Sequence, residues 1–395
     1  MFAKRTDWKL AENAYTRAVR GRQQSGERIL DLTASNPTTC GFRYDEEAIL
    51  SALRSPASLR YDPDPKGLIS ARSAVSAYYR EMNPSVDVDP EKLVLTTGTS
   101  EAYSFLFRLL CETGDEIVVA QPSYPLFEFL ATIQDVNLRP FRLLYDHGWQ
   151  IDFQALEQAI TPRAKAILLV HPNNPTGHFI RRDEAEKLRS ICAQHSLALV
   201  EDEVFLDYRL PCAASATALQ GTFAASARAL TFVLSGLSKI AALPQMKIGW
   251  IAASGPEALV HDALARLEII SDTYLSLSTP LQNALPALLA ERQKMQSQLS
   301  GRIEANLAAL DASLTRQKLV SRLEMEGGWY AVLRIPATQS DEEFAIGLLE
   351  KLGVLVQPGH FYEFPGDGYL VVSLLTPTED FKEGIRGLLA CVAGS

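Results

Sequence analysis

Residues 230–250 read LTFVLSGLSKIAALPQMKIGW, in which an apolar run is followed by a loop that carries two lysines. The run at residues 230–234 predicts a short buried strand, and Lys239 lies in the Gly- and Ser-bounded loop directly after it. A lysine in such an apolar setting is unusual, because lysine side chains are mostly exposed. Desolvation lowers the pKa of an amine, and a partly neutral amine can form a Schiff base with a carbonyl group. An ordinary surface loop explains the spacing equally well.

Five further short apolar runs, each bounded by polar or turn residues, predict strands at residues 93–97, 116–120, 166–170, 197–201 and 248–252. Strands that helices cover on both faces have this character, which is typical of a mostly parallel sheet. Helices are expected between them, for example at residues 100–111 and 183–195. This alternation predicts an α/β fold in which residues 45–275 form one large, doubly wound domain with a mostly parallel sheet.

The pattern changes after about residue 275. A long helix is expected at residues 280–314, followed by strands at 328–334, 354–357 and 369–374. Helices are expected at residues 341–352 and 378–391 between and after these strands, so residues 276–395 predict a smaller α+β domain. Residues 1–44 predict a helical N-terminal arm that packs against this small domain and forms part of it.

The composition disfavours several classes of protein. The chain has 395 residues with 38 Lys+Arg against 47 Asp+Glu, and a net charge of −9 argues against non-specific nucleic-acid binding. No uncharged apolar run reaches the length of about 18 residues that a membrane span needs, so no membrane association is expected. The five cysteines form no CxxC pair and no disulfide framework, which favours a cytoplasmic location. The six histidines lack metal-binding spacing, so no metal is expected.

Two polar motifs follow other predicted strands. Residues 171–177 read HPNNPTG, and the Asn174 amide at a strand end can hydrogen-bond a ligand oxygen, although the motif also describes a plain turn. Residues 201–203 read EDE, where one carboxylate could hold a cation or a protonated ring nitrogen. An acid pair at a helix N-terminus is the alternative for this motif.

A third motif joins a strand to a helix. Residues 97–102 read TGTSEA, and small residues there let backbone N–H groups at a helix N-terminus approach a phosphate. The signal is weak alone, because strand–helix junctions often carry Gly and Ser. The motif is neither GxGxxG nor GxxxxGK[ST], which argues against dinucleotide and P-loop nucleotide sites.

In their order and spacing these motifs resemble those of the class I/II aminotransferases, the fold type I enzymes that use pyridoxal 5′-phosphate (PLP). The resemblance spans residues from about 30 to 390. It implies a PLP-dependent transferase that moves an amino group between an amino acid and a 2-oxo acid. It also implies that Lys239 forms the Schiff base and moves the substrate proton, that Asp202 pairs with the ring nitrogen, that Asn174 hydrogen-bonds the ring hydroxyl oxygen and that Tyr124 stacks on the ring.

The resemblance further implies a phosphate-binding group that consists of Gly98, Thr99, Ser100, Ser238 and Lys247. Tyr61 resembles the tyrosine that reaches the phosphate of the neighbouring subunit, which implies a homodimer with shared active sites. A packed surface tyrosine is an equal interpretation of Tyr61.

Three positions depart from the family pattern. Lys247 stands where the family usually has arginine, so the phosphate should still bind, with looser geometry. Phe205 replaces a usual tyrosine and removes one hydrogen bond to the ring oxygen, so we expect the imine proton to be held more tightly. Val371 occupies the position of the arginine that grips the substrate carboxylate. Asn36 and Arg334 are candidates to compensate, and His360 lies in a loop expected near the substrate.

Two rival functions remain open. The same cofactor chemistry supports β- or γ-elimination, so a PLP-dependent lyase is the nearest alternative, and Val371 keeps it open. A cofactor-binding, non-enzymatic sensor fused to a DNA-binding module is the other. Only about 30 to 45 residues precede the cofactor domain, too few for a helix-turn-helix module with a linker.

Overall fold

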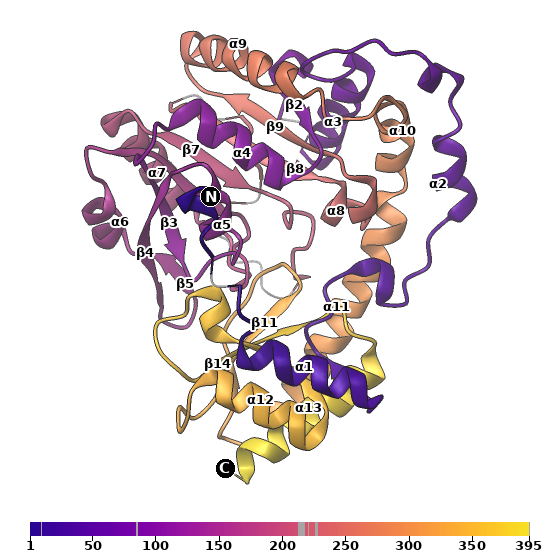
Figure 1. The fold of residues 1–395 in the computed structure, drawn as a ribbon, viewed down its shortest axis with the longest axis vertical. Helices are drawn as coiled ribbons and strands as arrows, with labels where there is room; N and C mark the ends of the chain where they lie inside the picture. The colour runs from indigo at the N-terminus through magenta and orange to yellow at the C-terminus, as the bar shows by residue number, and fades with distance from the viewer. Residues whose placement is uncertain (9, 84–85, 212–217, 220, 226–227, 395) are drawn as a thin grey trace.

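The computed structural model describes residues 1–8, 10–83, 86–211, 218–219, 221–225 and 228–394. Figure 1 shows an upper part built around a large sheet and a lower part built around a small one, with helix α11 running between them. None of the helices in the described ranges combines the length and the apolar character that a membrane span needs.

The large sheet has eight strands in the order β2-β9-β8-β7-β6-β3-β4-β5. Strands β3, β4, β6, β7 and β8 run parallel, whereas β9 is antiparallel to both β8 and β2, and β5 is antiparallel to β4. The strand bounds are β2 Leu93–Thr96, β3 Glu116–Gln121, β4 Asn137–Tyr145, β5 Trp149–Ile151, β6 Ala164–Val170, β7 Ala198–Asp202, β8 Thr231–Gly236 and β9 Gly249–Ser254.

Helices cover both faces of this sheet, which confirms the doubly wound α/β class. One face packs against α4 (Thr99–Leu110), α5 (Phe127–Ile133) and α9 (Glu257–Tyr274), whose apolar residues form one core cluster with the sheet. The other face shares a second cluster with α3 (Ile69–Met82), α6 (Phe153–Ala159), α7 (Arg182–His195), α8 (Leu237–Ile240) and α10 (Thr279–Ala290). Strands β7, β8 and β9 are buried along their whole length, and β6 is buried except at Lys165, as their apolar runs predict.

All six strands predicted for this region are present within a few residues, but the sequence analysis missed β4 and β5. Strand β4 lies next to the sheet edge, and only two of its nine residues are buried. It also contains Pro140, which argues against a strand in sequence-based reasoning. Its hydrophobic signal is therefore weak, and pairing with β3 is what makes it a strand.

The small sheet has the order β10-β11-β14-β13, with β10 Ser321–Arg322, β11 Tyr330–Arg334, β13 Gln357–Pro358 and β14 Tyr369–Ser373. Around it lie α1 (Ala14–Ser25), α12 (Asp341–Leu352) and α13 (Thr378–Ala393). The two-residue strand β1 (Leu30–Asp31) pairs in parallel with β12 (Val354–Leu355), so residues near the N-terminus join the C-terminal part of the chain. The domain limits themselves stay a prediction.

Two expectations for the C-terminal region were wrong. The helix expected at residues 280–314 is two helices, α10 and α11 (Arg292–Leu314), which meet at Glu291. Helix α10 packs on α3 beside the large sheet, whereas α11 packs on α13 beside the small sheet. The strand expected at residues 354–357 is also divided, because β12 pairs with β1 and β13 pairs with β14.

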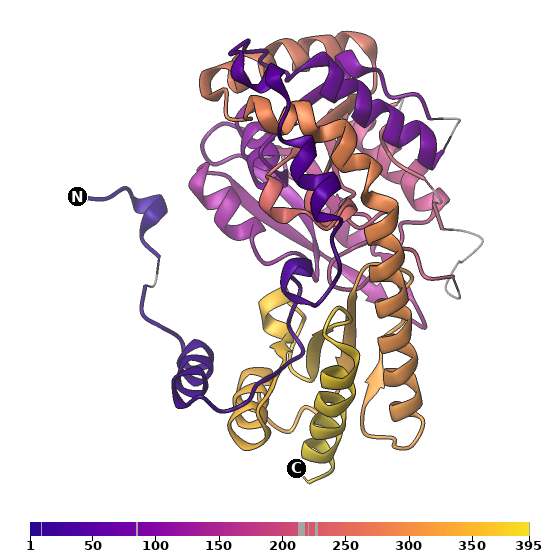
Figure 2. The same ribbon diagram turned by 90° about the vertical axis from the view of Figure 1, so that its right-hand side faces the viewer.

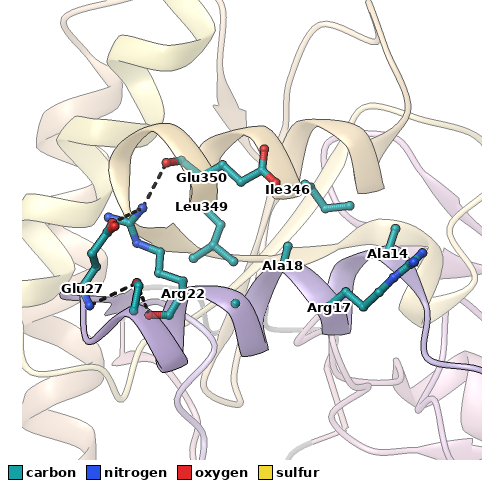
Figure 3. A pocket seen from close by; sticks show the side chains of 10 residues that line it. Ala14, Arg17, Ala18, Arg22, Glu27, Ile346, Leu349 and Glu350 are labelled. Carbon is teal, nitrogen blue, oxygen red and sulfur yellow. Dashed lines mark hydrogen bonds and ion pairs between the residues drawn. The ribbon is translucent and has the colours of Figure 1, made fainter.

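The remaining elements are short: the helix α2 (Glu46–Ala52) and the 3-10 turns Lys4–Thr6, Pro37–Thr39, Pro56–Leu59, Pro90–Lys92, Pro244–Met246 and Gly359–Tyr362. The N-terminal turn Lys4–Thr6 lies against α5 (Figures 1 and 2). Arg5 pairs with Asp135 there, and the Trp8 ring packs against Phe129. Between α1 and α12 lies an open hollow of about 590 Å³, where the Arg22 guanidinium donates to the carbonyl of Glu350 (Figure 3).

Candidate active site

The loops after four strands meet at one edge of the large sheet. Strands β6, β7 and β8 are parallel neighbours, so their carboxyl ends lie side by side. Strand β2 points the same way, because it is antiparallel to β9 and β9 is antiparallel to β8. The loops enclose a cavity of about 270 Å³. Ten residues singled out from the sequence line it: Gly98, Thr99, Ser100, Tyr124, Asn174, Asp202, Phe205, Ser238, Lys239 and Lys247.

Lys239 lies in α8, the single helical turn that follows β8. Gly236 allows the chain to turn there, because a Cβ on it would lie 2.7 Å from the carbonyl oxygen of Ile248. The Nζ atom of Lys239 lies 4.8 Å from the ring centroid of Trp329 and 5.8 Å from that of Phe205. Burial among these groups lowers the pKa of Lys239 to about 8, so a minor fraction of the amine is neutral near physiological pH, far more than in a free lysine.

Asp202 ends β7 and is buried beside the cavity. Its Oδ2 atom accepts a hydrogen bond of 2.6 Å from the Tyr103 hydroxyl, and its Oδ1 atom accepts one of 3.0 Å from the Val204 N–H. Burial raises the pKa of Asp202 to about 6, while these hydrogen bonds lower it. The carboxyl group is therefore mainly ionised at neutral pH, next to the cationic form of Lys239.

Asn174 follows β6 in a turn that its neighbour holds together. The Asn173 amide donates to the carbonyl of Pro122 over 3.2 Å and to the Thr176 hydroxyl over 2.9 Å. The Oδ1 atom of Asn174 is buried and has no hydrogen-bond partner within the described residues. Because burying an unpaired polar group is costly, this amide requires a partner from outside the chain.

The anion-binding corner is formed by the N-terminus of α4, a helix of twelve residues. Gly98 precedes the helix with φ 151°, a conformation that favours glycine, and a Cβ there would lie 3.7 Å from the Nζ atom of Lys247. The Lys247 ammonium therefore lies beside the first N–H groups of α4. A cation and a helix N-terminus together make a site for a phosphate-like anion.

Two aromatic side chains that the sequence predicted at the site, Tyr124 and Phe205, form part of the cavity wall. The Tyr124 ring packs edge-on against Phe127 at 5.5 Å, and burial raises the pKa of Tyr124 to about 12. The Phe205 ring packs edge-on against Trp329 at 4.9 Å. These contacts hold both rings at the cavity and keep this part of it apolar.

Four predicted residues do not line the cavity. The Asn36 side chain accepts hydrogen bonds from the N–H and hydroxyl of Thr38, so it caps a local turn. Arg334 is exposed at the end of β11, over the ring of Tyr369 at 4.1 Å, and His360 is exposed beside Phe361. Tyr61 is 75% exposed in a separate surface hollow.

Several further residues of the site were not predicted from the sequence. Ser35 and Tyr330 line the cavity from the small-sheet side, and Thr97, which begins the TGTSEA motif but was given no role there, lines it from the loop after β2. Tyr103 hydrogen-bonds Asp202, and the Tyr208 hydroxyl donates to the carbonyl of Lys239 over 2.6 Å. Only Tyr103 had a usable signal, because it lies one helical turn after the predicted phosphate-binding residues. Within the described residues, no group of three His, Cys, Asp or Glu side chains is arranged to hold a metal ion.

Comparison with known proteins identifies the class to which this fold and site belong. The sequence model of the family described as aminotransferase class I and II matches residues 28–387. The chain therefore belongs to the class I and II aminotransferases and is a transferase enzyme, as the sequence predicted. Members of this family act on amino acids and 2-oxo acids and generally depend on PLP.

Three relatives illustrate the range of similarity. Alanine aminotransferase of Mycobacterium tuberculosis is 27% identical over 374 residues, which cover 93% of this chain and 86% of the relative. The S-alkyl-thiohydroximate lyase SUR1 of Arabidopsis thaliana is 29% identical over 251 residues, which cover 63% of this chain and 53% of the lyase. The structure of an alanine aminotransferase from Pyrococcus furiosus shares the fold, with a TM-score of 0.87, 23% identity and complete coverage of both chains.

Proposed function

We propose that this chain binds PLP in the cavity and uses it to move an amino group from an amino acid to a 2-oxo acid. The observation that carries the proposal is the convergence of Lys239, Asp202 and Asn174 from three neighbouring strand ends upon one cavity. The donor set fits the cofactor: an amine for its aldehyde, a carboxylate for its ring nitrogen and a helix N-terminus with Lys247 for its phosphate. The unpaired Oδ1 atom of Asn174 supports a ligand in the same place.

When bound, PLP supplies an electron-accepting ring that stabilises the negative charge that develops at the substrate Cα. Asp202 holds the proton on the ring nitrogen, because its carboxylate is ionised at neutral pH and fixed by Tyr103. The Lys239 amine, with a pKa of about 8, would move the proton between the substrate Cα and the C4′ atom of the cofactor. The rings of Phe205 and Trp329 exclude water beside this amine.

Alanine is the first amino donor to test, since relatives that span most of the chain carry the name alanine aminotransferase. A lyase activity is the second candidate, and the similarity to the Arabidopsis lyase favours it. The two differ when a donor is supplied alone. A transferase releases one equivalent of oxo acid per site and stops until an acceptor is added, whereas a lyase turns over and releases ammonia.

The covalent test is reduction of the loaded protein with borohydride, followed by peptide mass spectrometry. We expect the cofactor mass on the peptide that contains Lys239 and its absence in Lys239→Ala, together with loss of activity. Lys187→Ala is the matched control, because Lys187 also lies over an aromatic ring, that of Phe153 at 4.1 Å, but outside the cavity. Full activity of Lys239→Ala would overturn the proposal.

We also propose a homodimer in which Tyr61 reaches the cavity of the partner subunit. The proposal is supported by the exposure of Tyr61 and of neighbouring apolar side chains such as Leu59, which is 93% exposed. Large exposed apolar side chains next to one another are typical of an interface. The cytoplasmic location that the cysteines favour stays a prediction.

A further inference from the structure

The cavity wall on the small-sheet side carries neutral hydroxyl groups. Tyr330 begins β11 and is 9% exposed, and Ser35 lies in the chain segment after β1. The Tyr124 hydroxyl lies close enough to Tyr330 for the two to interact electrostatically, and the rings of Tyr330 and Tyr362 are 6.3 Å apart. A substrate amine that reaches Lys239 therefore meets hydroxyl groups on this side.

The register of the small sheet shows that the side chains paired around Val371 are uncharged. Arg334, the next residue on the same face of β11, is exposed at the strand end and does not line the cavity. Tyr330 lies opposite Ser373, and Val332 lies opposite Val371, which also pairs with Gln357. Directly opposed and alternate residues share a face of an antiparallel sheet, so all five lie on one face. Every one of them is uncharged, and Val371 is fully buried.

Two polar groups on that face are already occupied within the chain. The Ser373 hydroxyl donates to the carbonyl of Ala34 over 2.6 Å, and the Gln357 amide oxygen accepts a hydrogen bond from the Tyr362 hydroxyl. The hydroxyl groups of Ser35 and Tyr330 hydrogen-bond each other, and together with that of Tyr124 they line this side of the cavity, where each can take a ligand as a further partner.

The charges of the cavity leave no cation for a substrate carboxylate. Lys239, Lys247 and Asp202 are the charged residues among the described ones that line it. In the proposed function Lys247 faces the cofactor phosphate, which carries a charge of about −1.5 to −2, and Lys239 bonds to the cofactor. A carboxylate in the remaining space has no cation from the residues that the structure describes, and burying an unpaired anion is strongly unfavourable.

We propose that this site accepts amines in which a neutral polar group, an amide or a primary alcohol, replaces the α-carboxylate, at least as well as it accepts the corresponding amino acids. The proposal rests on the proposed function. Hydroxyl groups both donate and accept hydrogen bonds, so they match an amide or an alcohol as well as a carboxylate. In the net exchange the donor CH–NH₂ becomes C=O while the C=O of the acceptor becomes CH–NH₂, so no oxidant or reductant is needed.

The experiment compares three donors that share one side chain: L-alanine, L-alaninamide and L-2-amino-1-propanol. Each is mixed alone with the PLP-loaded protein, and the decay of the absorbance of the lysine-bound cofactor gives a second-order rate constant. Because the three amines differ in pKa, rates are measured over a range of pH and expressed per free amine. Mass spectrometry identifies the 2-oxo amide or hydroxyketone formed.

We expect the neutral donors to react at least as fast as alanine, because the carboxylate of alanine is an anion that no cation of the described residues pairs with in the remaining space. A preference for alanine overturns this inference and leaves the proposed function intact. A loaded protein that reacts with none of the three donors overturns both.

Variants separate recognition from folding. Tyr330→Phe is expected to slow the neutral donors about three- to tenfold, the effect of one lost neutral hydrogen bond, without loss of cofactor. Tyr369→Phe is the control, because Tyr369 lies on β14 and outside the cavity.

Ser35→Lys places a cation at the wall and is expected to shift the preference towards alanine by at least tenfold. A shift towards the amide would contradict the proposal, and the partly buried position of Ser35 tolerates this change better than the buried Val371.

Discussion

The Tyr103 hydroxyl and the Oδ2 atom of Asp202 form a hydrogen bond of 2.6 Å between two buried side chains, one on helix α4 and one at the end of β7. This bond links the element that carries the anion-binding corner to the carboxylate proposed to face the ring nitrogen. It also stabilises the charged form of Asp202 against the burial that raises its pKa. Tyr103 is thus a positioning residue, which acts through Asp202.

Replacing Tyr103 with phenylalanine removes a hydrogen bond that favours the carboxylate, so the pKa of Asp202 rises further above about 6. The acidic limb of the pH profile of kcat/KM is expected to move up by about one pH unit. The absorbance of the bound cofactor should shift with it. Tyr78→Phe is the control, since the hydroxyl of the buried Tyr78 donates a comparable, partly buried hydrogen bond of 2.8 Å to Asp207 outside the cavity. If the acidic limb of kcat/KM moved equally in Tyr103→Phe and Tyr78→Phe, the shift would reflect reduced stability of the fold, and Tyr103 would not act through Asp202.

Replacing Phe205 with tyrosine restores a hydroxyl beside Lys239. The added hydroxyl would donate a hydrogen bond to the ring oxygen of the cofactor. That oxygen would then accept a weaker hydrogen bond from the protonated imine nitrogen of Lys239, so the imine loses its proton more easily. The pH at which the absorbance of the lysine-bound cofactor changes is therefore expected to fall by about one unit. Phe129→Tyr, at an exposed ring outside the cavity, should leave it unchanged. An upward shift in Phe205→Tyr would contradict this view of the site.

Mixed dimers test the role of Tyr61. We expect Tyr61→Phe to bind cofactor more weakly and Lys239→Ala to be inactive. If Tyr61 serves the partner subunit, a heterodimer of the two variants contains one site with both native residues, so tight cofactor binding and activity return to half the sites. If Tyr61 serves its own subunit, co-expression restores nothing. Titration of cofactor by fluorescence in the separated heterodimer distinguishes the outcomes.

His171 is expected to weaken the fold in acid. Burial lowers its pKa to about 3, below the unfolded value of 6.5, so the unfolded chain binds more protons between these two values. The contribution of His171 to stability is present above pH 6.5 and is lost as the pH falls towards 3. In urea unfolding, His171→Gln should reduce the dependence of the unfolding free energy on pH by about 1.4 kcal/mol per pH unit between about pH 6 and 4. His261→Gln, at an exposed position, should not change this dependence.

Local patterns in the sequence predicted most of the fold and ten of the residues that line the cavity. Strands such as β7 and β8 are buried on both faces, so their apolar runs carry the signal. Asp202 is the last residue of β7, and Lys239 follows β8 within three residues. Strand β4 escaped prediction because its exposed, Pro-containing sequence becomes a strand only through pairing with β3.

The sequence by itself determined the αβ alternation, the family and the polar residues that follow the strands, because each of these is written in neighbouring residues. The tertiary structure alone decided what those residues meet. Ser35 and Tyr330 lie about 300 residues apart in the chain and line one cavity, and Tyr103 reaches Asp202 across 99 positions. The small sheet also decided that the wall around Val371 is uncharged, since only the pairing of β11, β13 and β14 sets which side chains share its face. Such contacts depend on the packing of distant segments, which no local pattern encodes.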